Sequence, residues 1–227
     1  MENFWVTTEG AWGDGSVHLT TTGSVIVVIL IAAILITTAI LRQRKSTKKI
    51  GLTTKQLVFS STAIAISIVC SMIKLFEMPM GGSVTLLSML FVVLIAYWYG
   101  PYAGIMTAVA YGLVQFVMEP IFYTLPQMLL DYPLAFGALG LAGFFSKKKW
   151  GLQLGYLVGV AGRFVFSTLS GVIFFASYAP EGMNPWVYSI LYQGSYLLPE
   201  AIITLILVSI KPVANALSRV KAEALNS

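Results

Sequence analysis

The chain alternates between long apolar runs and short polar stretches, and the length of the runs matches the thickness of a membrane. A bilayer core about 30 Å thick requires roughly 20 apolar residues per helix. Seven runs approach or reach this length, at 24–41, 56–73, 84–99, 103–118, 125–145, 152–175 and 187–210. The strand-like alternation of an outer-membrane barrel is missing, so we expect an all-α integral membrane protein.

Clusters of basic residues orient this expected bundle. They follow the first, fifth and seventh runs: Arg42, Arg44, Lys45, Lys48 and Lys49; Lys147, Lys148 and Lys149; Lys211, Arg219 and Lys221. Seven alternating spans bring all three clusters to one side, which the positive-inside rule identifies as the cytoplasm. We therefore expect the N-terminus outside and the C-terminus inside. We also expect five segments: an outer polar tail (1–24), an extra transmembrane helix (25–41), a basic cytoplasmic linker (42–54), a six-helix substrate-binding body (55–210) and a cytoplasmic tail (211–227).

Composition narrows the possible functions. Of the 227 residues, 57% are hydrophobic and only 10% are charged, and the mean hydropathy is +0.83. Soluble domains carry about 25% charged residues, so a soluble enzyme is excluded. The net charge of +5 lies in clusters between the spans, which predicts lipid contact and no nucleic-acid partner. With one cysteine and one histidine the chain cannot assemble a Cys/His zinc cluster, and we expect neither a metal nor a cofactor.

Three ionisable residues, Asp131, Arg163 and Glu200, lie inside apolar runs. Such residues are costly in a membrane and are therefore candidates for function. One interpretation is that Arg163 pairs with Asp131 or Glu200 and holds helices together. The other is that one carboxylate is left for a ligand. Both remain open for Asp131, whereas we favour the structural role for Arg163 and Glu200.

Asp131 is expected roughly 10 Å deep from the outer side, given a rise of 1.5 Å per residue. Several small, polar and aromatic residues of the last two spans are expected near the same depth: Ser167, Gly171, Phe175, Tyr188, Tyr192 and Gln193. A carboxylate among aromatic rings, hydroxyls and amides suits a small heteroaromatic ligand, particularly a cationic one.

The second run carries a row of small residues, Ser61 and Ala65, that could dock another membrane protein. From the residues alone, internal packing is the favoured interpretation. The chain has no GxxxxGK[ST] loop and therefore cannot itself hydrolyse ATP in the P-loop manner. It also lacks recognisable hydrolase motifs, so we expect a protein that is not an enzyme.

Three segments of the chain resemble one known family. They are MPMGGSVTLLSM (78–89), LLDYPLAFGALGLAGFF (129–145) and GRFVFSTLSGVIFFASYAPEGMNPWVYSILYQGSY (162–196). All three, in this order, resemble the ThiT/YuaJ family of thiamine-binding S-components of energy-coupling factor (ECF) transporters. The resemblance covers the six-helix body and leaves the first helix outside it.

The resemblance implies a plasma-membrane subunit that captures thiamine from outside and delivers it through a transmembrane coupling protein and two ATPases. It carries the ligand-binding role of the family to Asp131, Tyr132, Gly171, Phe175 and Tyr188. The family's outer loop, which closes over the ligand, falls on Gly81, Gly82 and Ser83. The docking face falls on Ser61, Ala65 and Val69, so the resemblance favours docking over internal packing for this row.

The chain departs from the family pattern at three positions. Many members have histidine, asparagine and glutamine where this chain has Ser167, Gln193 and Met80. We expect Ser167 and Gln193 to complete the polar part of a thiamine site. A first alternative keeps the architecture but binds another small heteroaromatic ligand, such as a thiamine precursor or a B6 vitamer. A second is a self-contained ion-coupled carrier that uses the intramembrane charges as a relay.

Overall fold

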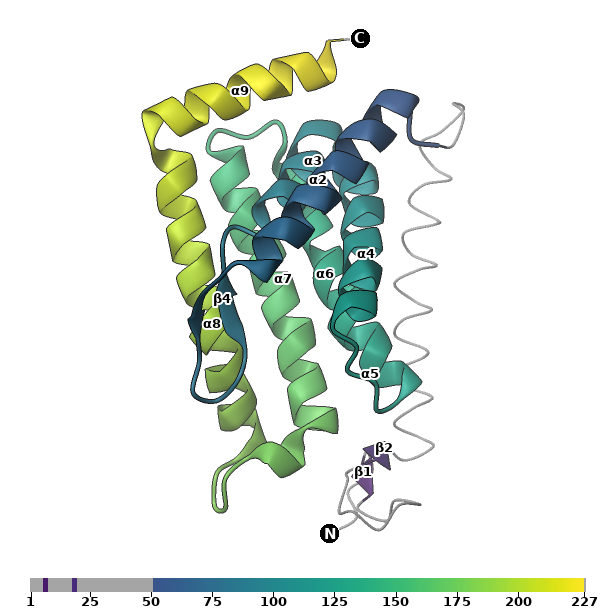
Figure 1. Cartoon of the computed structure of the whole chain (residues 1–227), viewed down its shortest axis with the longest axis vertical. Coiled ribbons are helices and arrows are strands. Elements are labelled where there is room, and N and C mark those ends of the chain that lie inside the picture. Colours follow the sequence, from purple (N-terminus) through teal and green to yellow (C-terminus); the bar gives the residue numbers. More distant parts are fainter. Residues whose placement is uncertain (1–5, 8–17, 20–50, 227) are drawn as a thin grey trace.

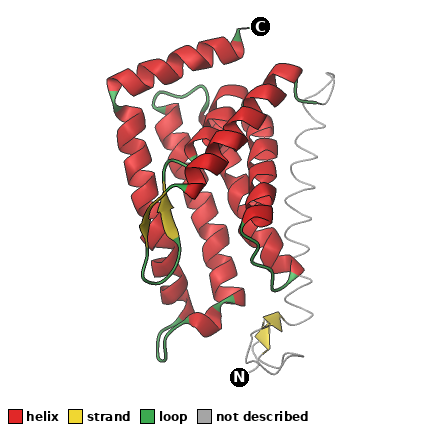
Figure 2. Ribbon diagram, in the orientation of Figure 1, coloured by secondary structure: helices red, strands yellow, loops and turns green. Residues whose placement is uncertain are grey.

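The computed structural model describes residues 6–7, 18–19 and 51–226. The expected extra helix at 25–41, most of the outer tail and most of the basic linker lie outside the described residues. Within 51–226, six helical segments form a bundle (Figures 1 and 2). They are α2 (Thr54–Met72), α3 (Leu90–Tyr99), α4 (Pro101–Met118), the segment Leu125–Phe145, α7 (Gly151–Phe174) and α8 (Pro185–Ser209). Five are long and apolar enough to cross a membrane, and α3 is shorter.

The helix boundaries follow local sequence signals. Thr53 and Gln56 form a capping box, in which each side chain accepts a hydrogen bond from the other residue's backbone N–H, and α2 begins directly after Thr53. Gly100, at φ +91°, ends α3, and Pro101 starts α4. A glycine tolerates this backbone conformation and proline suits the first helical position, so α3 and α4 form the tight hairpin expected from the sequence.

The segment Leu125–Phe145 has the boundaries predicted from hydropathy, but it is not a uniform α-helix. It consists of α5 (Leu125–Leu129), the π-helical η1 (Leu130–Leu134), α6 (Ala135–Gly137) and the 3-10 helix η2 (Ala138–Phe145). Pro133 lies inside η1 and has no N–H to donate, which accounts for a departure from α-helical hydrogen bonding at this point.

The expected span at 84–99 is wrong at its N-terminal end. Strand β4 (Ser83–Thr85) pairs antiparallel with β3 (Lys74–Glu77), and α3 starts only at Leu90. The turn between the strands contains Gly81 and Gly82, both at positive φ. Hydropathy alone does not distinguish a short apolar strand from the first turns of an apolar helix. These residues therefore form a hairpin over the bundle instead of the first turns of a span.

The core is built around Leu125–Phe145, which packs against α3, α4 and α7. Glycines make the approach close: a Cβ atom at Gly140 would lie 2.4 Å from the Ile105 nitrogen, and one at Gly159 would lie 3.0 Å from Leu139 Cα. Gly151, Gly155 and Gly159, which follow i, i+4 spacing in the inner half of α7, therefore serve helix packing, as rows of small residues do in other membrane proteins.

The expected cytoplasmic tail contains a helix, α9 (Lys211–Leu225), which crosses the end of the bundle (Figure 1). The Lys55 Nζ atom donates hydrogen bonds to the carbonyl oxygens of Glu223 and Asn226. Tyr99 Oη donates to the carbonyl oxygen of Ala224 at 3.0 Å. These contacts tie α9 to α2 and α3.

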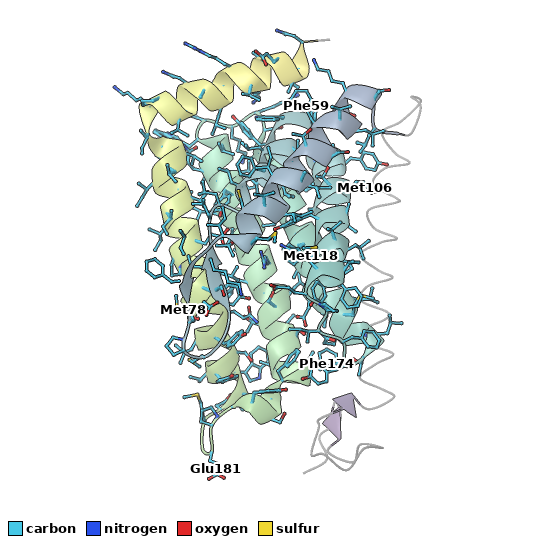
Figure 3. All side chains as sticks on the ribbon, in the orientation of Figure 1. Phe59, Met78, Met106, Met118, Phe174 and Glu181 are labelled. Carbon is cyan, nitrogen blue, oxygen red and sulfur yellow. The ribbon has the colours of Figure 1, made fainter. Side chains whose placement is uncertain are left out.

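The ends of the bundle differ in charge. Trp150, which directly follows Lys147, Lys148 and Lys149, lines a groove together with Lys221 of α9. The basic loop therefore lies at the α9 end of the bundle. Glu181 lies at the opposite end (Figure 3). The positive-inside rule assigns the α9 end to the cytoplasm, in agreement with the predicted orientation of the body. The short strands β1 (Val6–Thr7) and β2 (His18–Leu19) lie at the end opposite α9 (Figure 1).

We expect Gly140→Ala to lower the free energy of unfolding by about 1–3 kcal/mol, because the added methyl group has to push apart two closely packed backbones. Gly194→Ala is the matched control, since the nearest atom to a Cβ there is 3.6 Å away. Thermal unfolding of the purified protein in detergent measures both. Equal transition temperatures for the two variants would contradict this account of the core.

Candidate ligand-binding site

A cavity of about 920 Å³ opens toward the outer end of the bundle, between the β3–β4 hairpin, Leu125–Phe145, α7 and α8. All seven residues predicted to contact a ligand line it: Asp131, Tyr132, Ser167, Gly171, Phe175, Tyr188 and Gln193. Gly82 and Ser83 of the expected outer loop line it as well. Gly81 does not, but it packs behind the wall, where a Cβ atom would lie 3.1 Å from Tyr192 Oη. The structure brings the predicted residues together, and their role in ligand binding stays a prediction.

Asp131 is positioned by a buried neighbour one helical turn away. The Nε2 atom of Gln127 donates to Asp131 Oδ2 at 2.6 Å and to the Ile121 carbonyl oxygen at 3.2 Å, and Gln127 Oε1 accepts from the Tyr123 N–H at 3.0 Å. Gln127 is fully buried. It therefore fixes the carboxylate in the cavity wall and joins it to the loop that precedes α5.

The expected ion pair of Arg163 with Asp131 or Glu200 is wrong. In the part of the chain that the structure describes, the one ion pair is between Lys74 and Glu77, at 3.5 Å. The Arg163 guanidinium instead lies 4.0 Å from the centroid of the Phe136 ring, a cation–π contact, and its buried Nε atom has no hydrogen-bond partner. The direction of the side chain, which spacing along α7 does not reveal, decides this arrangement.

Glu200 is 3% exposed and is held by uncharged donors. Its Oε2 atom accepts from Thr85 Oγ1 at 2.7 Å, and its Oε1 atom accepts from Ser88 Oγ at 2.9 Å and from the Met89 N–H at 3.4 Å. The favoured structural role agrees with these contacts, but the partners are the hairpin and the start of α3 and not a cation.

Aromatic rings cover much of the cavity wall. On α8 the ring centroids of Tyr188 and Tyr192 are 6.1 Å apart, and those of Tyr192 and Tyr196 are 5.9 Å apart. Across the mouth, Phe175 lies edge-on to Tyr123 at 5.3 Å. Tyr123 was not singled out in the sequence, because it lies in a loop where periodicity gives no signal.

Two predicted ligand residues are engaged by the protein itself. Tyr132 Oη donates to the Glu119 carbonyl oxygen at 2.7 Å, and Tyr132 as a whole residue is 8% exposed. Gln193 Nε2 donates to the Ser167 carbonyl oxygen at 3.3 Å, and Gln193 Oε1 accepts from Tyr196 Oη. Only parts of these side chains are therefore free to contact a ligand.

The row with Ser61 and Ala65 and a second row of small residues, Ala63 and Ser67, lie on opposite faces of α2. Ala63 and Ser67 are buried in the bundle, whereas Ser61, Ala65 and Val69 are exposed. The predicted docking residues thus lie on the face of α2 that points away from the bundle, and the row with Ala63 and Ser67 serves internal packing.

Comparison with known proteins decides the family. Residues 57–218 match the family model described as thiamine transporter protein (Thia_YuaJ). The chain belongs to the Thia_YuaJ family. As a Thia_YuaJ protein it is a multi-pass transport protein of the plasma membrane and not an enzyme, as the sequence predicted. The family match begins after the extra helix expected at 25–41.

Thiamine transporters from two bacteria are similar to this Thia_YuaJ protein. The thiamine transporter ThiT of Bacillus subtilis is 35% identical over 160 residues, which are 64% of this chain and 82% of the relative. ThiT of Lacticaseibacillus paracasei is 30% identical over 129 residues, which are 51% of this chain and 62% of the relative. A solved structure of ThiT from Listeria monocytogenes has a TM-score of 0.54 and 23% identity, and the match covers 70% of this chain and 93% of that one. This last similarity supports the fold.

We expect Gln127→Met to lower the free energy of unfolding by about 1–3 kcal/mol, because the Tyr123 N–H and the Ile121 carbonyl lose their buried partner. Gln153→Met is the control, since the Gln153 side chain has no hydrogen bond in the structure. Thermal unfolding in detergent compares the two. A Gln127→Met variant as stable as the control would contradict the positioning role.

Proposed function

We propose that the chain is the thiamine-binding subunit of an uptake system and captures the vitamin from the outer side of the membrane. The observation that carries the proposal is Asp131, which is held by the buried Gln127 in an aromatic-walled cavity of a protein from a thiamine transporter family. The B. subtilis and L. paracasei relatives are both thiamine transporters by name.

The chemistry of the cavity suits thiamine. The Asp131 carboxylate accepts hydrogen bonds from the aminopyrimidine, and its charge favours a cationic thiazolium in a partly desolvated site. Phe175 and Tyr188 offer ring faces for stacking and for cation–π contact. Ser167 and the remaining free part of Gln193 complete the polar contacts.

A different heteroaromatic ligand is the alternative, and one observation favours it. Both ends of the Gln193 amide are already hydrogen-bonded, to Ser167 and Tyr196. Gln193 therefore has fewer hydrogen bonds to offer a ligand, and a site with fewer polar contacts discriminates less strongly in favour of thiamine over a similar heteroaromatic compound. A self-contained carrier has less support, because the side chains of Asp131, Arg163 and Glu200 make no hydrogen bond or ion pair with one another that could join them in a relay.

We expect purified protein to bind thiamine saturably in isothermal titration calorimetry. Asp131→Asn is expected to weaken binding by about tenfold or more, because it removes a charged acceptor. Glu181→Gln, which changes an exposed carboxylate at the outer end, is the control and keeps wild-type affinity. Binding of a thiamine precursor or a B6 vitamer with rejection of thiamine would overturn the assignment in favour of the alternative ligand.

We further propose that delivery requires a transmembrane coupling protein and two ATPases, as in ECF transporters. The chain has no P-loop to supply ATP hydrolysis itself. The exposed row Ser61, Ala65 and Val69 on α2 supports a docking face, because small residues allow another helix to approach closely.

Ala65→Trp is expected to abolish thiamine uptake in cells that contain the coupling proteins, while thiamine binding to the purified variant stays at the wild-type level. Ala161→Trp makes the same change at an exposed position of α7 and serves as the control. Uptake of radiolabelled thiamine and calorimetry separate transport from binding. Normal thiamine uptake by the Ala65→Trp variant would contradict the proposal that this face of α2 is the docking site.

A further inference from the structure

A single row of α8 runs along the cavity and ends at Glu200. Tyr188, Tyr192, Tyr196 and Glu200 follow i, i+4 spacing, and all four line the cavity. The spacing places them one above another on the same helix face. The tyrosines have ring faces to offer a ligand, but Glu200 has a different set of contacts.

The tip of the β3–β4 hairpin rests on two of these tyrosines. A Cβ atom at Gly82 would lie 2.6 Å from Tyr196 Cδ1, and one at Gly81 would lie 3.1 Å from Tyr192 Oη. Both glycines have positive φ, at +79° and +95°, which side chains rarely adopt. The tip therefore packs on α8 through van der Waals contact with flat rings.

The inner end of the hairpin is held in another way. Thr85, the last residue of β4, and Ser88 donate to the two carboxylate oxygens of Glu200 at 2.7 and 2.9 Å, and the Met89 N–H donates at 3.4 Å. Met89 is the N-cap residue of α3 and its side chain makes no capping hydrogen bond. Glu200 thus supplies from α8 the acceptor that the start of α3 lacks.

The difference between the two attachments has a mechanical consequence. Hydrogen bonds to a buried carboxylate are costly to break, because the partners are left unsatisfied in a low-dielectric environment. Packing of the glycine tip on tyrosine rings can be separated without leaving a buried polar group. Residues 78–82 can therefore move away from the cavity, while Thr85 and Ser88 at the inner end of the hairpin stay fixed to Glu200.

We propose that Glu200 is a positioning residue that anchors the inner end of the β3–β4 hairpin over the cavity and thereby slows release of the ligand. The effect on release rests on the proposed function, whereas the anchoring does not. Glu200 acts through Thr85, Ser88 and the hairpin, and the role requires no contact between Glu200 and the ligand.

The test measures hairpin motion and ligand release separately. A nitroxide is attached at residue 80 in a Cys70→Ser, Met80→Cys background, and its mobility is recorded by electron paramagnetic resonance without ligand. Release of radiolabelled thiamine is followed in chains that keep Met80. Glu200→Leu removes the acceptor while filling the space, and Thr85→Val removes one donor from the hairpin side, so the second variant decides the question should the first fail to fold.

We expect Glu200→Leu to increase label mobility and to speed thiamine release about tenfold, the effect of losing hydrogen bonds to a carboxylate. Thr85→Val should change both in the same direction by less. Glu200→Gln should restore values near the wild type, because an amide can still pair with the two hydroxyls. Thr204→Val is the control: Thr204 is equally buried one turn along α8 and bonds Tyr156 and the Glu200 carbonyl oxygen, away from the hairpin.

Wild-type label mobility in both Glu200→Leu and Thr85→Val would overturn the proposal. So would an equal increase in Thr204→Val, since that would indicate general loosening of α8. Failure of the wild type to bind thiamine would count against the proposed function instead, and label mobility would still decide the role of Glu200.

Discussion

Leu125–Phe145 packs closely against α3, α4 and α7, and this packing determines how the helices around the cavity are placed. In its inner half this segment meets neighbouring backbones through glycines such as Gly140, where a Cβ would lie 2.4 Å from the Ile105 nitrogen. Toward the outer side the segment carries Asp131, and the residues facing it on α7 and α8 leave a cavity of about 920 Å³. The same helices are thus sealed at one end and open at the other, which is what a protein that receives a ligand from outside needs.

The three ionisable groups inside the bundle form no ion pair with one another, and the buried Arg163 Nε atom has no hydrogen-bond partner. Asp131 is held by an amide, Glu200 by two hydroxyls and a backbone N–H, and Arg163 by the face of Phe136. Groups that are removed from water require such partners, since lipid supplies none. Asp131 and Glu200 both lie in apolar runs of the sequence, but their surroundings differ. Asp131 lies in the cavity wall beside Gln127, and Glu200 accepts hydrogen bonds from Thr85 and Ser88 at the inner end of the hairpin.

Much of the fold follows from the sequence, because hydropathy and basic clusters respond directly to the membrane. The segment 125–145 was predicted with its observed boundaries, and the α9 end is the basic end. The β3–β4 hairpin was missed, because Val84 to Met89 is as apolar as a span. The partner of Arg163 was wrong, because it depends on side-chain direction. Helical spacing and the resemblance to a family together predict the cavity residues that lie on helices, whereas Tyr123 lies in a loop, where neither gives a signal.

The proposed function requires the cavity beside Asp131 to hold thiamine. Native mass spectrometry of the protein, purified gently from membranes of cells grown with thiamine, gives the mass of whatever compound the cavity retains, without a prior choice of ligand. We expect a one-to-one complex with the mass of thiamine, and a clearly smaller amount of it on the Asp131→Asn variant. A bound compound of another mass, or an equal amount of thiamine on the variant, would contradict the proposed function.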